Sequence, residues 1–199
     1  MALVISERVL FVRERSAGFY KASSYLFSKI IVDMIPVRII PLLTLGSIMY
    51  FMTGLQQVYF NFCRFLLTLA LTQFTATSIT LFISASCRDF GQANLIGSVL
   101  FIFFIIFGGV LVNGNSDSSV LRYLSFVFYA FEALMANEFK GIPLTLRTSL
   151  GEIPITGDVV LGVFALDANN LPRDLLVLTA FGIVALILAY ISLKTRKRA

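Results

Sequence analysis

The residues that could carry chemistry are few, and their types exclude most catalytic and metal-binding sites. The sequence has no histidine, so neither a histidine general base nor a histidine-ligated metal can be built from it. Its two cysteines, Cys63 and Cys87, stand at opposite ends of one apolar run. If that run is a helix they lie about 36 Å apart, too far for a disulfide. We predict no catalytic residue, no metal site and no enzyme activity in this chain.

The remaining candidates are charged side chains in apolar surroundings. Glu14 lies in the amphipathic segment 6–34, whose cations suit a helix at a membrane surface. Arg38 stands just inside the first long apolar run, where an arginine side chain extends back to the edge of the membrane. Glu132 and Glu138 stand in a later, mostly apolar stretch, and both a structural and a functional role are open for them.

Four long uncharged runs must position these side chains. Of the 199 residues 58% are hydrophobic and 14% are charged, and the mean hydropathy is +0.89, values that exclude a soluble globular domain. A helix needs about 20 largely apolar residues to cross a hydrocarbon core about 30 Å thick. Each run is long enough, so we predict four transmembrane helices, over residues 35–53, 62–85, 93–112 and 175–193.

The chain is expected to divide into four parts. Residues 1–34 hold the end of a preceding span and cytoplasmic surface helices, and residues 35–112 hold three spans. Residues 113–174 form an external loop with a helix over 120–139. Charged side chains interrupt the apolar pattern of that helix, which makes it re-entrant or interfacial. Residues 175–199 hold the last span and a basic tail.

The distribution of basic residues predicts the orientation. Segments 6–38, 86–92 and 194–199 hold six, one and four Lys and Arg residues, which is 11 of the 16, and segments 54–64 and 113–174 hold the other five. The positive-inside rule then puts both termini in the cytoplasm and the long loop outside. The basic clusters are not interleaved with stacking aromatic residues in a soluble fold, so we expect membrane lipid, not nucleic acid, as a partner.

Several short motifs follow one another along the chain. The first reads ERVLFVRER over Glu7–Arg15 and is followed by Gly18-Phe19-Tyr20. The others are SYL at 24–26, DMIP at 33–36, YFMTGL at 50–55, FGGVLVN at 107–113 and EALMANEF at 132–139. In this order the motifs resemble those of the ABCG (White-type) ABC half-transporters. The resemblance implies an all-α membrane protein that holds spans three to six of an ABC type-II exporter membrane domain. It also implies cytoplasmic coupling helices and an external loop with a re-entrant helix.

The resemblance implies further parts that this chain does not supply. No G-x-x-x-x-G-K-[ST] loop occurs in the sequence, and such a loop is needed to hold the phosphates of ATP. We therefore expect no cofactor in this chain, with ATP and Mg on a separate nucleotide-binding domain. That domain and a second membrane half, in a homo- or heterodimer, are the implied protein partners. The plasma membrane is the implied location.

The resemblance also implies roles for individual residues. The substrate cavity would be lined by Ser98, Val99, Ile102 and Ile105. The outer plug beyond that cavity would be formed by Val110 and Leu111. Coupling to the ATPase would fall to Glu7, Arg13, Glu14, Gly18 and Tyr20. Gly108 and Gly109 would allow the close helix approach of a dimer seam.

Ordinary helix packing remains an alternative for the cavity residues. Ser98, Ile102 and Ile105 share one face of a helix, as a cavity wall requires. However, that helix is apolar on every face, so its periodicity does not separate the two roles.

The function implied by the resemblance is ATP-driven export of amphipathic compounds, lipids or sterols by alternating access. Two alternatives stay open from the sequence. The chain is either a non-transporting membrane protein that oligomerises with or regulates a full transporter, or an inactive truncated fragment.

Overall fold

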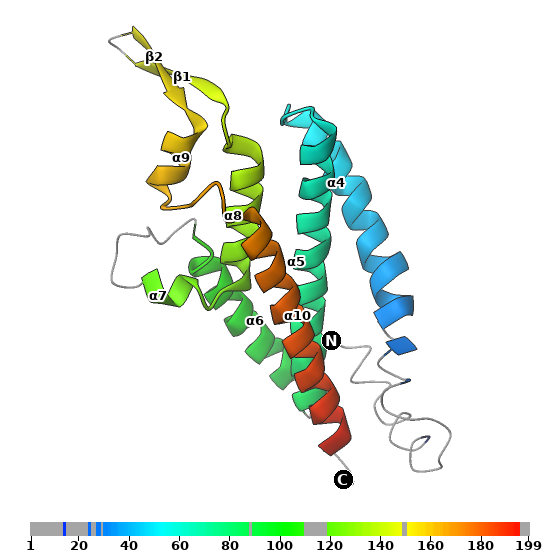
Figure 1. Ribbon diagram of the computed structural model, residues 1–199. Helices are drawn as coiled ribbons and strands as arrows, with labels where there is room; N and C mark the ends of the chain where they lie inside the picture. The colour runs from blue at the N-terminus through cyan, green and yellow to red at the C-terminus, as the bar shows by residue number, and fades with distance from the viewer. Residues whose placement is uncertain are drawn as a thin grey trace.

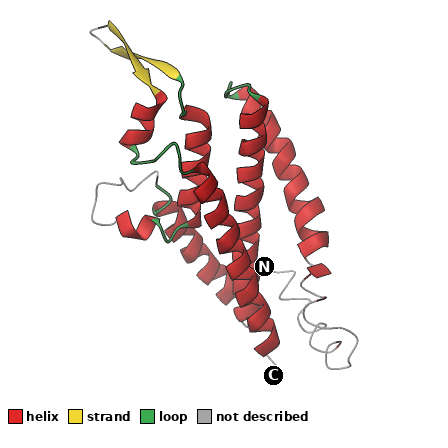
Figure 2. Ribbon diagram, viewed as in Figure 1, coloured by secondary structure: helices red, strands yellow, loops and turns green. Residues whose placement is uncertain are grey.

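The computed structural model describes residues 14, 24, 27, 28, 30–87, 89–109, 119–148 and 151–195. These residues are mostly helical, with one β-hairpin at one end of the molecule (Figures 1 and 2). In chain order the elements are η1 (Ile30–Ile39), α4 (Ile40–Met52), α5 (Tyr59–Ser86), α6 (Phe90–Ile106), α7 (Ser119–Arg122), α8 (Phe126–Phe139), β1 (Pro143–Thr148), β2 (Gly151–Thr156), α9 (Gly157–Val163) and α10 (Leu171–Thr195).

Within the described residues, two helices are long and apolar enough to cross a membrane. They are α5, with 28 residues, and α10, with 25, and they contain the predicted spans 62–85 and 175–193. The other two predicted spans correspond to shorter apolar helices, Pro36–Met52 and Phe90–Ile106. The structure therefore provides helices in all four uncharged runs, and a count of four crossings stays a prediction.

The helix α6 is shorter than the predicted span 93–112. It ends at Ile106, and the backbone of Gly109 then has a φ of +92°. This conformation is left-handed, is readily adopted by glycine and does not continue an α-helix. The predicted span therefore ends earlier than its apolar composition indicates.

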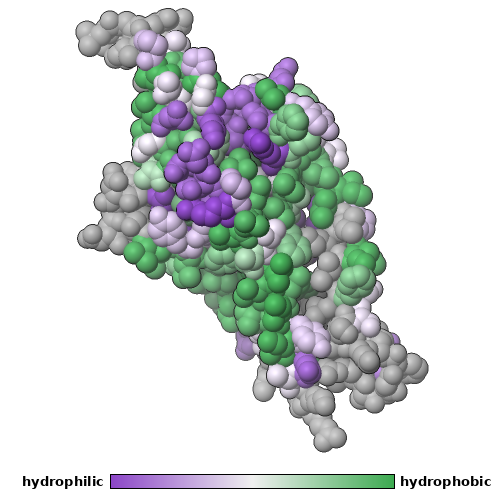
Figure 3. All heavy atoms as spheres, viewed as in Figure 1, coloured by the Kyte–Doolittle hydropathy of each residue, from purple (hydrophilic) through white to green (hydrophobic). Residues whose placement is uncertain are grey.

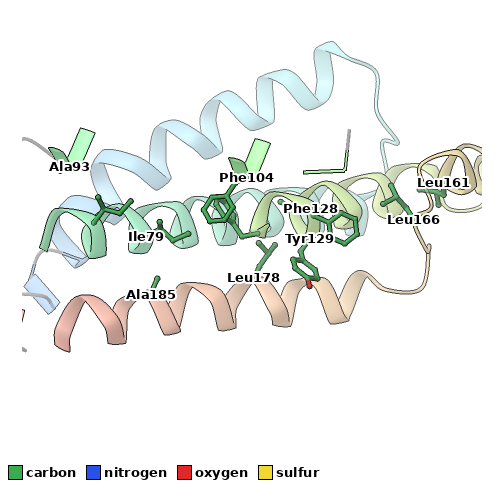
Figure 4. Close-up of a cluster of buried hydrophobic side chains, with 12 residues drawn as sticks. Ile79, Ala93, Phe104, Phe128, Tyr129, Leu161, Leu166, Leu178 and Ala185 are labelled. Carbon is green, nitrogen blue, oxygen red and sulfur yellow. The ribbon is translucent and has the colours of Figure 1, made fainter. Parts of the chain in front are cut away.

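The core lies where α5, α8 and α10 run side by side. Figure 4 shows Ile79 of α5, Tyr129 of α8 and Leu178 and Ala185 of α10 in this one cluster of buried side chains. The hydroxyl of Thr75 in α5 adds a polar contact, since it lies 2.9 Å from the carbonyl oxygen of Leu178 in α10. Burial of apolar side chains and this hydrogen bond fix α10 against α5.

Two prolines lie where the first apolar helix changes its geometry. Pro36 is inside the ten-residue π-helix η1, where its missing N–H removes one helical hydrogen bond. Pro41 lies in the first turn of α4, which follows η1 without a break, so it removes a second helical N–H. The prolines thus coincide with a π-helical segment followed by a regular α-helix.

The segment between α6 and α10 contains more structure than the sequence predicted. The expected helix over 120–139 is divided into α7 and α8, because the chain turns at Ser125 and its hydroxyl donates to the carbonyl of Phe104 at 2.7 Å. Beyond α8, β1 and β2 pair antiparallel, with Pro143 opposite Thr156. The mostly helical structure agrees with the predicted all-α membrane domain. The hairpin was not predicted, because glycines and prolines that indicate a loop also occur at the turns between strands.

Candidate functional site

One side of α6 is exposed along the helix and carries all four residues predicted to line a substrate cavity. Ser98 is exposed, and the exposed fractions of Val99, Ile102 and Ile105 are 61%, 56% and 58%. An exposed apolar surface of this kind contacts lipid, another protein surface or a bound hydrophobic molecule. The structure brings the four residues onto one surface, and their role in binding a substrate stays a prediction.

The opposite side of α6 is buried against the rest of the chain. Its buried residues are Ala93, Gly97 and Phe104. The ring of Phe104 lies 5.0 Å from the ring of Phe126 in α8, in an edge-on arrangement. The helix therefore has a packing face and an exposed face, although the sequence shows no such difference.

The two glycines after α6 are packed against α8 of the same chain. A Cβ atom on Gly108 would lie 2.9 Å from Val127, and one on Gly109 would lie 3.0 Å from the ring of Phe128. Both distances are shorter than normal Cβ contacts. The close approach therefore exists within this chain, and a dimer seam at these glycines stays a prediction.

The other predicted site residues are mostly not described. The plug residues Val110 and Leu111 lie outside the described residues, as do the coupling residues Glu7, Arg13, Gly18 and Tyr20. Glu14 is among the described residues; its backbone is helical and the residue is partly buried. The plug and coupling roles stay predictions.

A set of polar contacts joins the turn after α4 to the end of α8, and we call it the α4–α8 clasp. Glu138 accepts a hydrogen bond from the backbone N–H of Gln56 at 2.6 Å, and the Gln56 side-chain amide donates to the Glu138 carbonyl at 2.7 Å. Asn61 donates to the Gln56 side-chain oxygen at 2.7 Å, and the Asn137 amide donates to the Asn61 carbonyl at 2.9 Å. The Tyr50 hydroxyl donates to the Gln56 carbonyl. The clasp holds α4, α5 and α8 together at one end of the bundle.

A second polar cluster joins α8 to the start of α10. Arg173 lies 3.0 Å from Glu132 and 3.1 Å from Asp174, and these two carboxylates are only 2% and 0% exposed. Glu132 also accepts hydrogen bonds from the backbone N–H of Asp167 at 3.2 Å and from the Asn170 amide at 3.3 Å. Two buried carboxylates thus share one arginine, so removal of that arginine leaves uncompensated buried charge.

Arg122 is a buried cation that fixes the chain reversal before α10. It is 3% exposed, and its guanidinium donates to the carbonyls of Ala165 at 2.8 Å and Phe164 at 3.4 Å. The same group lies 4.3 Å from the centre of the Phe128 ring, a favourable cation–π distance. The backbone of Ala165 has a φ of +51°, which the two hydrogen bonds help to hold.

Sequence reasoning identified only some of these polar residues. Glu132 and Glu138 stood out because they interrupt apolar sequence. Glu138 belongs to the α4–α8 clasp, and Glu132 belongs to the polar cluster with Arg173. Gln56, Asn61 and Arg173 were missed, since they lie near the ends of apolar runs where polar residues are expected in contact with water. Among the described residues, no group of three or more Cys, Asp or Glu side chains is arranged to hold a metal ion.

Comparison with known proteins gives the family of the chain. Residues 1–139 match the family described as ABC-2 type transporter. The chain is 35% identical over 203 residues to the ABC transporter G family member 24 of Dictyostelium discoideum. This alignment covers 96% of this chain and 17% of that protein. It is 31% identical over 207 residues to the broad substrate specificity ATP-binding cassette transporter ABCG2 of Bos taurus. This alignment covers 98% of this chain and 32% of that protein.

A third relative is the Protein white of Ceratitis capitata, 29% identical over 199 residues, which covers 97% of this chain and 29% of that protein. The chain thus spans a third or less of the length of each of these relatives. The matches confirm the resemblance found in the sequence, and they extend over almost the whole chain. This chain is an integral membrane protein that belongs to the ABC-2 type transporter family, with the characteristics of an ABCG-type membrane domain.

Proposed function

We propose that this chain forms part of the membrane domain of an ATP-driven ABCG-type transporter that exports amphipathic compounds, lipids or sterols. The observation that carries the proposal is the one-sided burial of α6. Its exposed face holds Ser98, Val99, Ile102 and Ile105. This face is apolar except for the hydroxyl group of Ser98. Apolar burial is non-directional and scales with area, so such a wall suits substrates of many shapes.

The proposed transporter is a dimer, homo- or heteromeric, in which the exposed α6 faces of the two halves enclose the substrate cavity. A nucleotide-binding domain outside these residues binds ATP and Mg. ATP binding there acts on the coupling segment 6–34 and opens the cavity past Val110 and Leu111. The proposed location is the plasma membrane, with both termini in the cytoplasm.

The test is an assay of dye-stimulated ATP hydrolysis, with matched substitutions on two helices. The chain is reconstituted in liposomes with a nucleotide-binding partner, and ATP hydrolysis is measured with and without a fluorescent amphipathic dye. Ile102→Trp and Ile105→Trp are expected to raise the dye concentration that gives half-maximal stimulation by about tenfold, which corresponds to a loss of about 1.4 kcal/mol in dye binding. Ile187→Trp is the control, because Ile187 is 51% exposed on α10 and is not part of the proposed cavity.

Two results would count against the proposal. Absence of dye-stimulated ATP hydrolysis with every nucleotide-binding partner would remove the transport function. If dye stimulation changes equally in the α6 variants and in Ile187→Trp, the exposed face of α6 does not line the substrate cavity, although a transport function is still possible.

A further inference from the structure

A small cavity lies between the start of α5, the end of α8 and the start of α10. Its volume is ≈ 220 Å³, and its wall includes Arg64, Asn137, Lys140 and Asn169. Figure 3 shows hydrophilic residues gathered over the part of the surface where α8 ends and α10 begins, above a largely hydrophobic flank. The cavity is smaller than the roughly 300–1,000 Å³ typical of a drug-sized ligand, so it suits a compact polar group.

The cavity wall includes two cationic side chains that form no ion pair with a described carboxylate. Within the part of the chain that the structure describes, the ion pairs are those of Arg173, and neither Arg64 nor Lys140 takes part in one. The Lys140 ammonium donates to the Asn169 side-chain oxygen at 3.0 Å, which orients it and leaves further N–H donors available. Arg64 and Lys140 both line the cavity, and each side chain can donate hydrogen bonds to anionic oxygen atoms.

Asn137 adds a buried acceptor to the same wall. Its residue exposure is 6%, and its amide nitrogen donates to the Asn61 carbonyl at 2.9 Å. That bond fixes the orientation of the amide and leaves Asn137 Oδ1 buried with no hydrogen-bond partner among the described residues. Since buried polar atoms are normally paired, this oxygen indicates a ligand that supplies an N–H or O–H donor.

The depth of the cavity along α5 indicates where such a ligand comes from. The 28 residues of α5 make a helix about 42 Å long, which exceeds a hydrocarbon core of about 30 Å. Arg64 is in the second turn of α5, about 7.5 Å from its start. Tyr59 and Phe60, at that start, are 75% and 70% exposed, as is typical of aromatic residues at a membrane interface. In a membrane-spanning α5, Arg64 would therefore lie near the level of the lipid headgroups.

We propose that this cavity binds a phosphate ester that also carries a hydrogen-bond donor, and that the ligand is the phosphoethanolamine headgroup of a membrane lipid. The phosphate oxygens accept hydrogen bonds from Arg64 and Lys140, and the ammonium group donates to Asn137 Oδ1. The site is separate from the exposed face of α6. It therefore does not depend on the proposed transport function.

The test is a lipid titration of the full chain in detergent, followed by native mass spectrometry. Phosphatidylethanolamine is compared with phosphatidylcholine, which has the phosphate but no N–H donor, and with free phosphoethanolamine. Phosphatidylethanolamine is expected to bind most tightly, with about tenfold weaker binding in Arg64→Gln and in Lys140→Gln. Lys194→Gln is the matched control, since Lys194 is an exposed cation in the last turn of α10, and it is expected to bind lipid as the wild type does.

The outcomes separate the two sources of the phosphate ester. Equal lipid binding by the wild type, Arg64→Gln and Lys140→Gln would overturn the site. Equal binding of both lipids would overturn the role of Asn137. Free phosphoethanolamine that binds as tightly as the lipid, with the same loss in both variants, would assign the site to a soluble phosphate ester and overturn the lipid assignment. Lys140 is exposed, so Lys140→Gln is informative even if Arg64→Gln fails to fold.

Discussion

The Glu138 carboxylate accepts a hydrogen bond from the backbone N–H of Gln56 at 2.6 Å, across 82 positions of the chain. Gln56 returns a bond from its side chain to the Glu138 carbonyl. This reciprocal pair fixes the turn between α4 and α5 to the last turn of α8. Glu138, which interrupts the apolar sequence of α8, therefore forms a structural contact between distant segments of the chain.

Substitution of Glu138 tests this contact. Glu138→Ala leaves the Gln56 N–H without its acceptor, so we expect the free energy of unfolding to fall by about 1–3 kcal/mol. Glu138→Gln keeps a side-chain oxygen at the same place and is expected to lose less. Thermal unfolding in detergent measures both, and equal losses in the two variants would show that the acceptor does not matter.

Removal of Arg173 is expected to be more damaging. Arg173→Gln leaves Glu132 and Asp174 buried without a counter-charge, and breaking a buried pair costs about 3–5 kcal/mol. The Arg173 side chain is 48% exposed, so we expect a loss near the lower end of that range. Denaturant unfolding in mixed micelles gives the value.

A compensating variant provides the control for that loss. Addition of Glu132→Gln and Asp174→Asn to Arg173→Gln removes the buried negative charge. The triple variant should then be more stable than Arg173→Gln alone. If it is less stable, hydrogen-bond geometry and not charge balance holds this cluster together.

The contact between α5 and α10 depends on the absence of a side chain at Gly182. A Cβ atom there would lie 2.5 Å from the Phe74 ring, so Gly182→Ala forces the ring to move, and overpacking of this kind costs about 1–3 kcal/mol. Gly162→Ala is the matched control, because no atom lies within 4 Å of its Cβ position. Unfolding temperatures should fall for the first variant only, and an equal shift in both would contradict the packing account.

The two faces of α6 are expected to respond differently to truncation. Phe104→Ala removes a ring that is 8% exposed, and truncation of a core phenylalanine costs about 3–5 kcal/mol. Ile102→Ala, two residues away on the exposed face, should stay within about 0.5 kcal/mol of the wild type. Unfolding of both variants in detergent checks this, and a large loss for Ile102→Ala would show that the exposed face is packed within the chain.

The sequence by itself determined the long helices and the family. Uncharged runs of about 20 residues need helices because backbone polar groups have no partner in lipid, and α5 and α10 contain two of the four predicted spans. The ordered series of motifs gave the ABCG resemblance, which the family match over residues 1–139 and the similarity to G-family transporters confirmed. The hairpin β1–β2 was missed, because strand pairing depends on contacts that a glycine- and proline-rich segment does not specify alone.

Only the tertiary structure decided which faces are buried and which charges are paired. The helix α6 is apolar all round, so its sequence carries no signal for the burial of Phe104 and the exposure of Ile102. That choice follows from the place where α8 packs. The pairing of Glu138 with Gln56 and of Glu132 with Arg173 likewise depends on how distant segments meet. Periodicity reports the environment of a helix only when its faces differ in polarity.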